Sequence, residues 1–187
     1  MRKNNYERIL RVTAKLINQR GFKGASLQKI ADEVGLHKSS LFHYFKNKEE
    51  LVLRIIEKSI DEVNFSLEEI ANNHELSSEE KLKKAIDNHL ILIIKYIYNV
   101  NIYLNELRNL SKKSQRIYLE KRRRYGKHFE KIIGEMQTKG FFSGLDTKIV
   151  TYGLLGMLNW VLKWYKRDGP LTINEISNIF YGLIIKK

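Results

Sequence analysis

A group of polar side chains near the N-terminus has the chemistry needed to contact a nucleic acid. Their hydroxyl, amide, ammonium and imidazole groups donate or accept the hydrogen bonds that are made to base edges and phosphate oxygens. The candidates for base edges are Gln28, Lys38, Ser39, Ser40 and His43. Their close spacing predicts that one short stretch of chain presents them together.

The apolar residues around this group predict the elements that hold it. The residues spaced as one buried helix face are Leu27, Ile30, Ala31 and Val34. Gly35 follows them and is the residue type that ends a helix in a left-handed conformation. Leu41 and Phe45 then form a second short apolar stripe. This pattern predicts a helix-turn-helix, whose second helix enters the major groove of DNA.

The distribution of charge favours the same partner. The chain carries a formal charge of +13. Residues 1–50 hold 11 Lys and Arg against 5 Asp and Glu, residues 112–131 hold 9 against 2, and the rest is balanced. A basic N-terminal region indicates a phosphate backbone as the partner.

The N-terminal quarter resembles the DNA-binding domain of the tetracycline-repressor (TetR) family of transcription regulators. The matching residues are Arg20-Gly21-Phe22, Ser26 to Ile30-Ala31, Gly35-Leu36-His37, Leu41-Phe42-His43-Tyr44-Phe45, Lys48 and Leu51. Three positions depart from the family pattern: His37 replaces serine, Ser39-Ser40 replace Gly-Thr, and Phe42 replaces a tyrosine at a DNA-contacting position. The last change removes a hydroxyl and its phosphate hydrogen bond.

The resemblance assigns further roles in DNA binding. We expect Ser26 to cap the first helix of the motif and to meet a phosphate, and Tyr44 and Lys48 to contact the DNA backbone. Arg2 and Lys3 are expected to reach a minor groove as an arm. The resemblance implies a repressor that binds a palindromic operator as a homodimer.

The rest of the chain predicts more helices and no strands. Capping-box pairs, in which a polar residue is followed three positions later by Glu, occur at Asn47–Glu50, Ser77–Glu80 and Thr172–Glu175. About nine helices are predicted, which makes the fold class all-α. We expect a DNA-binding domain of three helices at 1–48 and a ligand-binding and dimerisation domain at 49–187.

Residues 146–167 predict a helix that is apolar on nearly every side and therefore buried on every side. In the family, the last two helices form a four-helix bundle with a second subunit. The expected dimerisation residues are Leu155, Leu158, Leu162, Ile176 and Phe180. The uncharged stretch of the helix predicted at 146–167 is Ile149–Leu162, which is shorter than the roughly 20 residues of a membrane span.

The C-terminal half also resembles a TetR subgroup that responds to acyl-CoA and controls fatty-acid and sterol degradation. The matching residues include Gly156 to Trp160, Trp164-Tyr165, Gly169 to Leu171, Glu175-Ile176, Asn105-Glu106 through Leu110, and Arg122 to Tyr125. This resemblance implies a fatty acyl-CoA effector. The expected ligand-binding residues are Leu90, Ile94, Tyr103, Leu107, Arg108, Arg122, Arg123, Arg124, Asn159, Trp160, Lys163 and Trp164.

These effector residues keep a second interpretation. Arg122–Arg124 are either a solvated helix face or ligands of the effector's phosphates at the mouth of the cavity. The same two roles are open to Lys166 and Arg167. Trp160 and Trp164 serve either packing or a ligand cavity. The alternative function is a repressor of a multidrug efflux gene that apolar drugs induce.

Other classes of function find little support in the sequence. Cysteine is absent, and the five histidines lack the spacing of helical metal ligands, so no metal site is expected. No phosphate loop, nucleophile elbow or carboxylate pair predicts an enzyme or a cofactor. The consecutive Lys121 to Arg124 spread round their helix, which argues against a membrane-surface helix. The N-terminus lacks a signal-peptide core, so the expected location is cytoplasmic.

Overall fold

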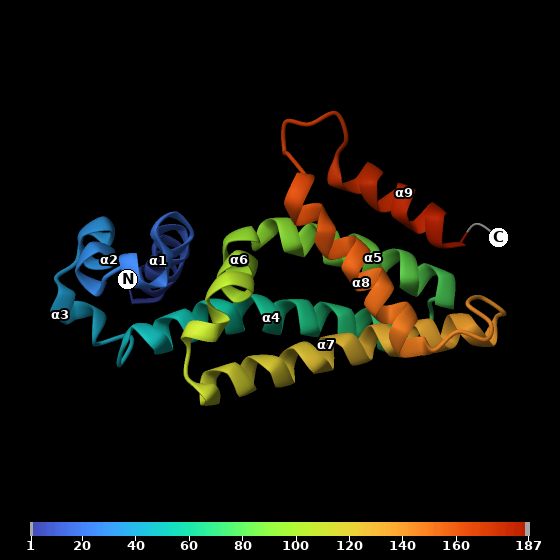
Figure 1. Cartoon of the computed structure of the whole chain (residues 1–187), viewed down its shortest axis with the longest axis horizontal. Helices are drawn as coiled ribbons and strands as arrows, with labels where there is room; N and C mark the ends of the chain where they lie inside the picture. The colour runs from blue at the N-terminus through green and yellow to red at the C-terminus, as the bar shows by residue number, and fades with distance from the viewer. Residues whose placement is uncertain (1, 186–187) are drawn as a thin grey trace. The chain divides into compact units, whose positions relative to one another are not determined.

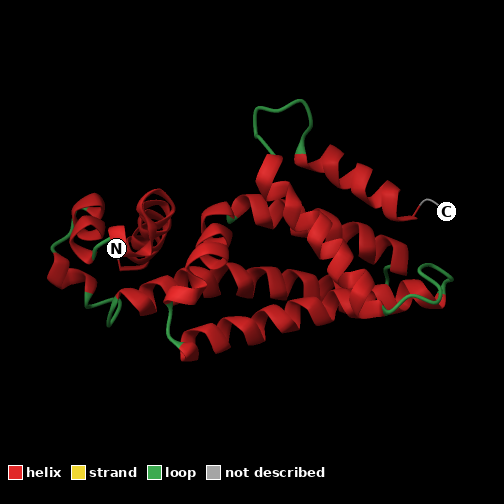
Figure 2. Cartoon of the chain, in the orientation of Figure 1, coloured by secondary structure: helices red, strands yellow, loops and turns green. Residues whose placement is uncertain are grey.

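The computed structural model describes residues 2–185, except for the side chains of Arg2 and Lys3. The backbone of these two residues is the start of the first helix, and their predicted minor-groove contacts fall on the side chains that are not described. Over this range the chain forms nine α-helices and one short 3-10 helix, with no β-strand (Figure 1, Figure 2). They are α1 (Arg2–Gly24), α2 (Leu27–Val34), α3 (Lys38–Leu41), α4 (Lys48–Asn72), α5 (Ser78–Lys95), α6 (Ile97–Glu106), η1 (Leu107–Asn109), α7 (Lys112–Thr138), α8 (Thr147–Trp164) and α9 (Ile173–Ile185). The predicted all-α fold is confirmed.

Local hydrogen bonds explain where several helices begin. At α4, the Glu50 N–H donates to Oδ1 of Asn47 over 2.8 Å. At α5, the N–H of Ser77 donates to Glu80 Oε2 over 2.8 Å and the Glu80 N–H donates back to the Ser77 hydroxyl. Thr172 and Glu175 make the same reciprocal pair before α9. The predicted capping boxes at Ser77–Glu80 and Thr172–Glu175 are therefore present in full. At Asn47–Glu50 only the Asn47 half forms, because the Glu50 carboxylate accepts from the N–H of Lys46 over 2.8 Å.

The first compact unit contains residues up to Asp61 together with Tyr96–Glu120. In it α1 packs on α2 and on α6, and α2 packs on α3. The ring of Tyr6 on α1 stacks on Phe45, with centroids 5.3 Å apart. Its buried apolar side chains include Ile9, Ile17, Leu41, Phe45, Leu51, Ile55 and Ile102. This core fixes α2 and α3 against α1.

The second compact unit contains Glu62–Lys95 together with the described residues from Lys121 onward. Here α5 contacts both α8 and α9. Its buried apolar side chains include Leu82, Ile86, Leu90, Phe129, Ile133 and Leu158. The Ser177 hydroxyl on α9 donates to the Asp87 carboxylate on α5. The loop between α8 and α9, which carries the lone proline, appears in green in Figure 2.

These units do not follow the expected division at residue 48. The difference arises because α6 packs on α1 and so joins the N-terminal helices, although it follows α5 in sequence. The long helices α4 and α7 each contribute residues to both units. The functional boundary at residue 48 remains a prediction. None of the described helices combines the length and apolar character that a membrane crossing requires.

Candidate functional site

The first helix of the predicted DNA-binding motif is built as the sequence indicates. The N–H of Lys29 donates to the Ser26 hydroxyl over 3.2 Å, so Ser26 caps α2. Gly35 ends the helix with φ 65° and ψ 37°, in the left-handed region. The N–H of Leu36 then donates to the Ala31 carbonyl over 2.9 Å, which closes a tight turn. Because a hydroxyl also donates, Ser26 can still meet a phosphate.

The second helix of the motif is held by two buried side chains. Leu41 and Phe45 are both buried, in accord with the predicted stripe. This leaves the other face of α3 and its following turn in solvent. We call this polar face the helix-turn-helix surface; its exposed residues are Lys38, Ser39, Phe42 and His43, and it is flanked by half-buried Ser40. The structure therefore brings together the residues predicted to meet DNA on this segment.

Gln28 and Tyr44 are held more firmly than a free contact residue would be. The Gln28 amide donates to Asp32 Oδ1 over 2.8 Å along the exposed side of α2. Tyr44 is half-buried, and its ring lies 6.3 Å from that of Phe45. The bond to Asp32 orients the Gln28 amide and leaves its carbonyl oxygen and second N–H for a base contact.

Lys48 does not present a free ammonium group to solvent. Its Nζ donates to the Phe22 carbonyl and lies 4.2 Å from the centroid of the Phe22 ring. Burial lowers the pKa of Lys48, and the nearby Glu106 carboxylate partly opposes this shift. The bond to Phe22 uses one of the three donors of the ammonium group, so the expected DNA-backbone contact by Lys48 stays a prediction. The structure adds an internal role that the sequence did not indicate.

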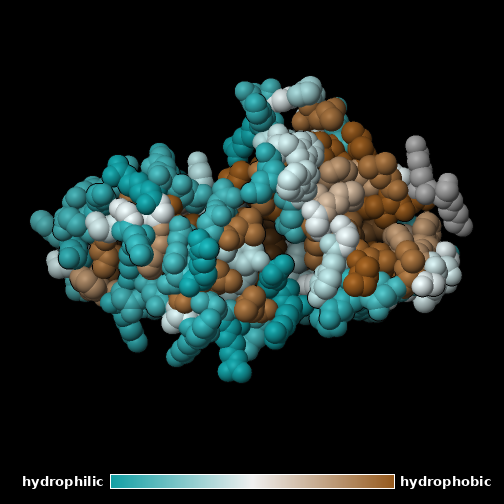
Figure 3. Space-filling model, viewed as in Figure 1, coloured by the Kyte–Doolittle hydropathy of each residue, from teal (hydrophilic) through white to brown (hydrophobic). Residues whose placement is uncertain are grey.

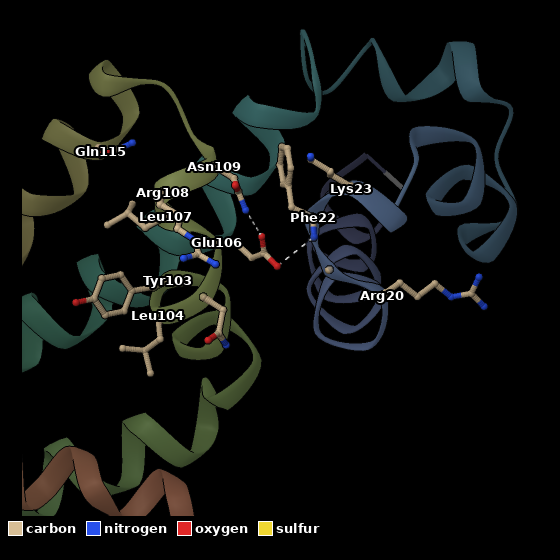
Figure 4. Close-up of a pocket in the computed structure, with 12 residues that line it drawn as sticks. Arg20, Phe22, Lys23, Tyr103, Leu104, Glu106, Leu107, Arg108, Asn109 and Gln115 are labelled. Carbon is tan, nitrogen blue, oxygen red and sulfur yellow. Dashed lines mark hydrogen bonds between the residues drawn. The ribbon is translucent and has the colours of Figure 1, made fainter.

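Glu106 makes a further unpredicted contact at the same place. Gly21 has φ 69° and ψ 169°, which breaks α1 as the sequence predicts, although a last turn continues to Gly24. The freed N–H of Phe22 donates to Glu106 Oε1 over 3.2 Å, and the Asn109 amide donates to Oε2 over 2.6 Å. One carboxylate thus holds the end of α1 to η1 within the first unit (Figure 4).

Three of the predicted effector residues line one cavity. Tyr103, Leu107 and Arg108 border a space of about 710 Å³ in the first unit, opposite residues Arg20–Lys23 of α1 (Figure 4). The Tyr103 ring lies 4.4 Å from that of Tyr118, which limits its movement. The structure thus groups these three residues, and it adds the end of α1 as the opposite wall.

The remaining predicted effector residues belong to the second unit and do not form a cavity lining with them. Leu90 is buried and Ile94 is half-buried. Arg122, Arg123 and Arg124 are exposed on α7, and Arg124 forms an ion pair with Glu68 at 2.6 Å. Exposed residues of α8 complete the set: Asn159, Trp160, Lys163 and Trp164. Leu90 thus lies in the core of the second unit while the two tryptophans are exposed on α8, and the expected position of an acyl tail among them remains a prediction.

The second unit contains a buried polar pair that the sequence reasoning missed. Nδ1 of His89 and the hydroxyl oxygen of Tyr125 lie 2.8 Å apart and share a hydrogen bond. Burial lowers the pKa of His89 to about 4 and raises that of Tyr125, so both groups are neutral at pH 7. Because the pair joins α5 to α7 across 36 positions, only the isolated apolar setting of His89 could have indicated it.

The predicted dimerisation residues divide into buried and half-buried sets. Leu158 and Ile176 lie in the core of the second unit, so these two side chains cannot contact a second subunit directly. Leu155, Leu162 and Phe180 are half-buried. We call the exposed apolar side chains of α8 and α9 the pairing face; they are Ile149, Tyr152, Trp160, Trp164, Ile179 and Leu183.

The members of the pairing face on α8 lie on one side of that helix, because they are separated by three, eight and four positions. Gly153 and Gly156 lie between them with open space where a side chain would be. Apolar residues gather over α8 and α9 on the face shown in Figure 3. Exposed apolar surface of this kind marks an interaction site.

In the described part of the chain, no three His, Asp or Glu side chains come together as a set of metal ligands. The candidate sites are therefore a polar surface, a cavity and an apolar face.

Two protein families match the chain. Residues 9–55 match the bacterial regulatory proteins of the tetR family, and residues 75–187 match the tetracyclin repressor-like C-terminal domain. Among individual proteins, the transcriptional repressor KstR2 of Mycolicibacterium smegmatis is 28% identical over 96% of this chain and 88% of its own length. The fatty acid metabolism regulator protein of Bacillus subtilis is 23% identical over 96% of this chain and 93% of its own.

Solved structures share the fold over nearly the whole chain. The regulator PfmR of Thermus thermophilus superposes with a TM-score of 0.86 at 24% identity, over 96% of this chain and 99% of its own. The structure of AibR in complex with isovaleryl coenzyme A and operator DNA superposes with a TM-score of 0.84 at 26% identity, covering 96% and 97% of the two chains.

Proposed function

Because this chain belongs to the tetracycline-repressor family of transcription regulators, we propose that it is a homodimeric repressor that a fatty acyl-CoA releases from a palindromic operator. Relatives named for fatty-acid metabolism and a coenzyme A complex of AibR support this class of effector. The observation that carries the DNA-binding part is the helix-turn-helix surface, whose polar groups are held outward by buried Leu41 and Phe45.

At the operator, α3 enters the major groove with Lys38, Ser39 and His43 facing base edges. Lys38 and Ser39 are exposed, so the ammonium and hydroxyl groups of these residues are available to base edges. Phe42 is half-exposed and offers an apolar contact, such as one to a thymine methyl group. Ser26 at the start of α2 contacts a phosphate.

The pairing face accounts for the dimer. A second copy covers Tyr152, Trp160 and their neighbours, and the small residues Gly153 and Gly156 let its backbone come close. Two-fold pairing places two recognition helices about one DNA turn apart. The tryptophans then serve the interface, which was one of the two roles that their sequence spacing left open.

The acyl-CoA effector changes operator affinity only if the two DNA-binding conformations bind it differently. Its acyl chain is placed near Leu90 and Ile94, where the packed interior of the second unit has to open to admit it, and its phosphates meet Arg122–Arg124. Lys166 and Arg167 at the end of α8 are a further place for these phosphates.

The test measures release of a labelled operator by fluorescence anisotropy. A panel of acyl-CoAs, free fatty acids and cationic drugs is added to the complex. We expect release by acyl-CoAs alone, and weaker release after Arg122, Arg123 and Arg124 are all changed to Gln. The matched control changes Lys112, Lys113 and Arg116 to Gln on the same helix. Release by the drugs alone would instead establish the efflux-gene repressor.

A further inference from the structure

The cavity between the end of α1 and the α6–η1 segment has an excess of positive charge. Arg20, Lys23 and Arg108 line it, against the single acid Glu106. No ion pair involves any of the three cations within the described residues. A cavity lined by three cations and one acid favours an anionic ligand.

In the part of the chain that the structure describes, Glu106 forms no ion pair with any of these three cations. Its two oxygens already accept hydrogen bonds from the Phe22 N–H and the Asn109 amide. The Gln115 amide is also occupied, because it donates to the Leu110 carbonyl over 2.8 Å. The donors that remain for a ligand are therefore chiefly those of the cationic side chains.

The close-up view separates the roles of the three cations. Arg108 lies beside Glu106, with Phe22 on the other side of that carboxylate, whereas Arg20 extends away from the other drawn residues (Figure 4). Arg108 is exposed and can reach a ligand without unfolding its segment. Lys23 supplies a second charge from α1.

We propose that this cavity binds a phosphate-bearing small molecule through Arg108 and Lys23, and that the ligand acts on the Glu106–Phe22 contact. A guanidinium group suits a phosphate because it donates two parallel hydrogen bonds. Tyr103 and Leu107 add an apolar wall, so the ligand has an organic portion as well as phosphate. This site goes beyond the proposed acyl-CoA function and stands whether or not the acyl chain is recognised.

The location gives such a ligand a direct route to the DNA-binding helices. Phe22 N–H bonds to Glu106 at the break in α1, and the Phe22 carbonyl accepts from Lys48 at the start of α4. α1 packs on α2, which leads into α3. An anion beside Glu106 repels the carboxylate, and so weakens the bond that holds the end of α1.

The experiment measures binding by calorimetry on the full chain without DNA. The probes are pyrophosphate, coenzyme A without an acyl group, and adenosine 3′,5′-bisphosphate, each at constant ionic strength. We expect Arg108→Gln to weaken binding about tenfold to hundredfold, as loss of one charge-assisted contact does. Lys113→Gln removes the same charge from an exposed position of the same unit outside the cavity and should bind like the wild type.

The three probes also identify the source of the phosphate. Binding of all three marks a general phosphate site, and binding of the two nucleotides alone marks recognition of the organic portion as well. Both results support the proposal if Arg108→Gln weakens them. Equal binding by wild type and Arg108→Gln would overturn it, as would absence of binding at millimolar concentration. Loss of binding only in the Arg122–Arg124 triple variant would assign the phosphate to α7 instead.

A second measurement tests the link to Glu106. The backbone amide resonance of Phe22 should shift as pyrophosphate is added to the wild type, and should stay in place in Arg108→Gln. A saturable binding curve without movement of this resonance would overturn the coupling. Neither measurement involves operator release, so failure of the acyl-CoA proposal would be seen separately.

Discussion

The helix-turn-helix surface and the pairing face are both exposed, but their chemistry is opposite. Apart from the ring of Phe42, the first presents lysine, serine and histidine, which remain well solvated when no partner is bound. The second presents tryptophan, tyrosine, isoleucine and leucine, whose exposure to water is unfavourable. The comparison indicates a reversible contact at the first surface and a lasting one at the second.

The largest expected effect comes from placing a charge in the pairing face. Trp160→Glu should give a monomer, and operator affinity should fall on the order of a hundredfold or more because two half-sites are no longer joined. Sedimentation and operator titration measure both effects. Phe65→Glu is the matched control, since Phe65 and Trp160 are both 63% exposed and Phe65 lies outside the face. If the Trp160→Glu protein remained a dimer, the pairing face would not be the dimer interface.

The next effect distinguishes a residue that stabilises the helix-turn-helix surface from a residue that contacts DNA. Leu41 is buried and its neighbour Phe42 is half-exposed. We expect Leu41→Ala to lower the free energy of unfolding by about 2–5 kcal/mol, because it leaves a cavity. Phe42→Ala should change stability by less than about 0.5 kcal/mol and should weaken DNA binding. Urea unfolding and operator titration of both variants distinguish these outcomes, and equal stability losses would contradict them.

The third effect tests the dry interior of the second unit through His89. Its pKa is about 4 in the folded chain, against 6.5 ordinarily, so the unfolded chain takes up a proton that the folded chain excludes. Stability should therefore fall as the pH drops from 6.5 towards 4, by up to about 3 kcal/mol.

Urea unfolding at pH 7 and pH 4.5 measures this loss. His89→Gln should remove most of the difference between the two pH values. Tyr125→Phe keeps the buried imidazole and should keep the difference. The same pH dependence in His89→Gln as in the wild type would show that another group is responsible.

The smallest effect concerns reading of the operator. Lys38→Ala should lower affinity for the operator by about 1–3 kcal/mol and relax the preference at one base pair. Lys15→Ala removes an exposed lysine of α1 from outside the surface and serves as control. Titrations against single-base operator variants measure the preference. A uniform loss over all sequences would make Lys38 a phosphate contact.

The parts of the structure that the sequence predicted well depend on neighbours in the chain. Ser26 caps α2 through Lys29, and Asn47 caps α4 through Glu50, each three positions away. Gly35 ends α2 because its left-handed backbone is accessible without strain. Such features are decided within one helical turn, so residue type and spacing are sufficient to predict them.

The contacts that escaped prediction join distant segments. Glu106 meets Phe22 across 84 positions, and Lys48 meets it across 26. A lysine in a matching motif position carries no sign that its ammonium group turns inward. Trp160 and Leu158 are both apolar and two positions apart, and only the packing of α5 on α8 decides which is buried.

The shortness of α3 has a consequence for how the molecule searches DNA. Only Lys38–Leu41 are helical, and a helix of four residues has no stability of its own in water. The helix is held in place by the buried side chains of Leu41 and Phe45 on one side, and its other side faces solvent. The amide hydrogens of this segment should therefore exchange with water faster than those of α4, and should slow on a matching operator. Ordering α3 on DNA then costs conformational entropy, and only the contacts made with a matching operator offset this cost. Part of the protein's preference for its operator over other DNA sequences follows from this difference.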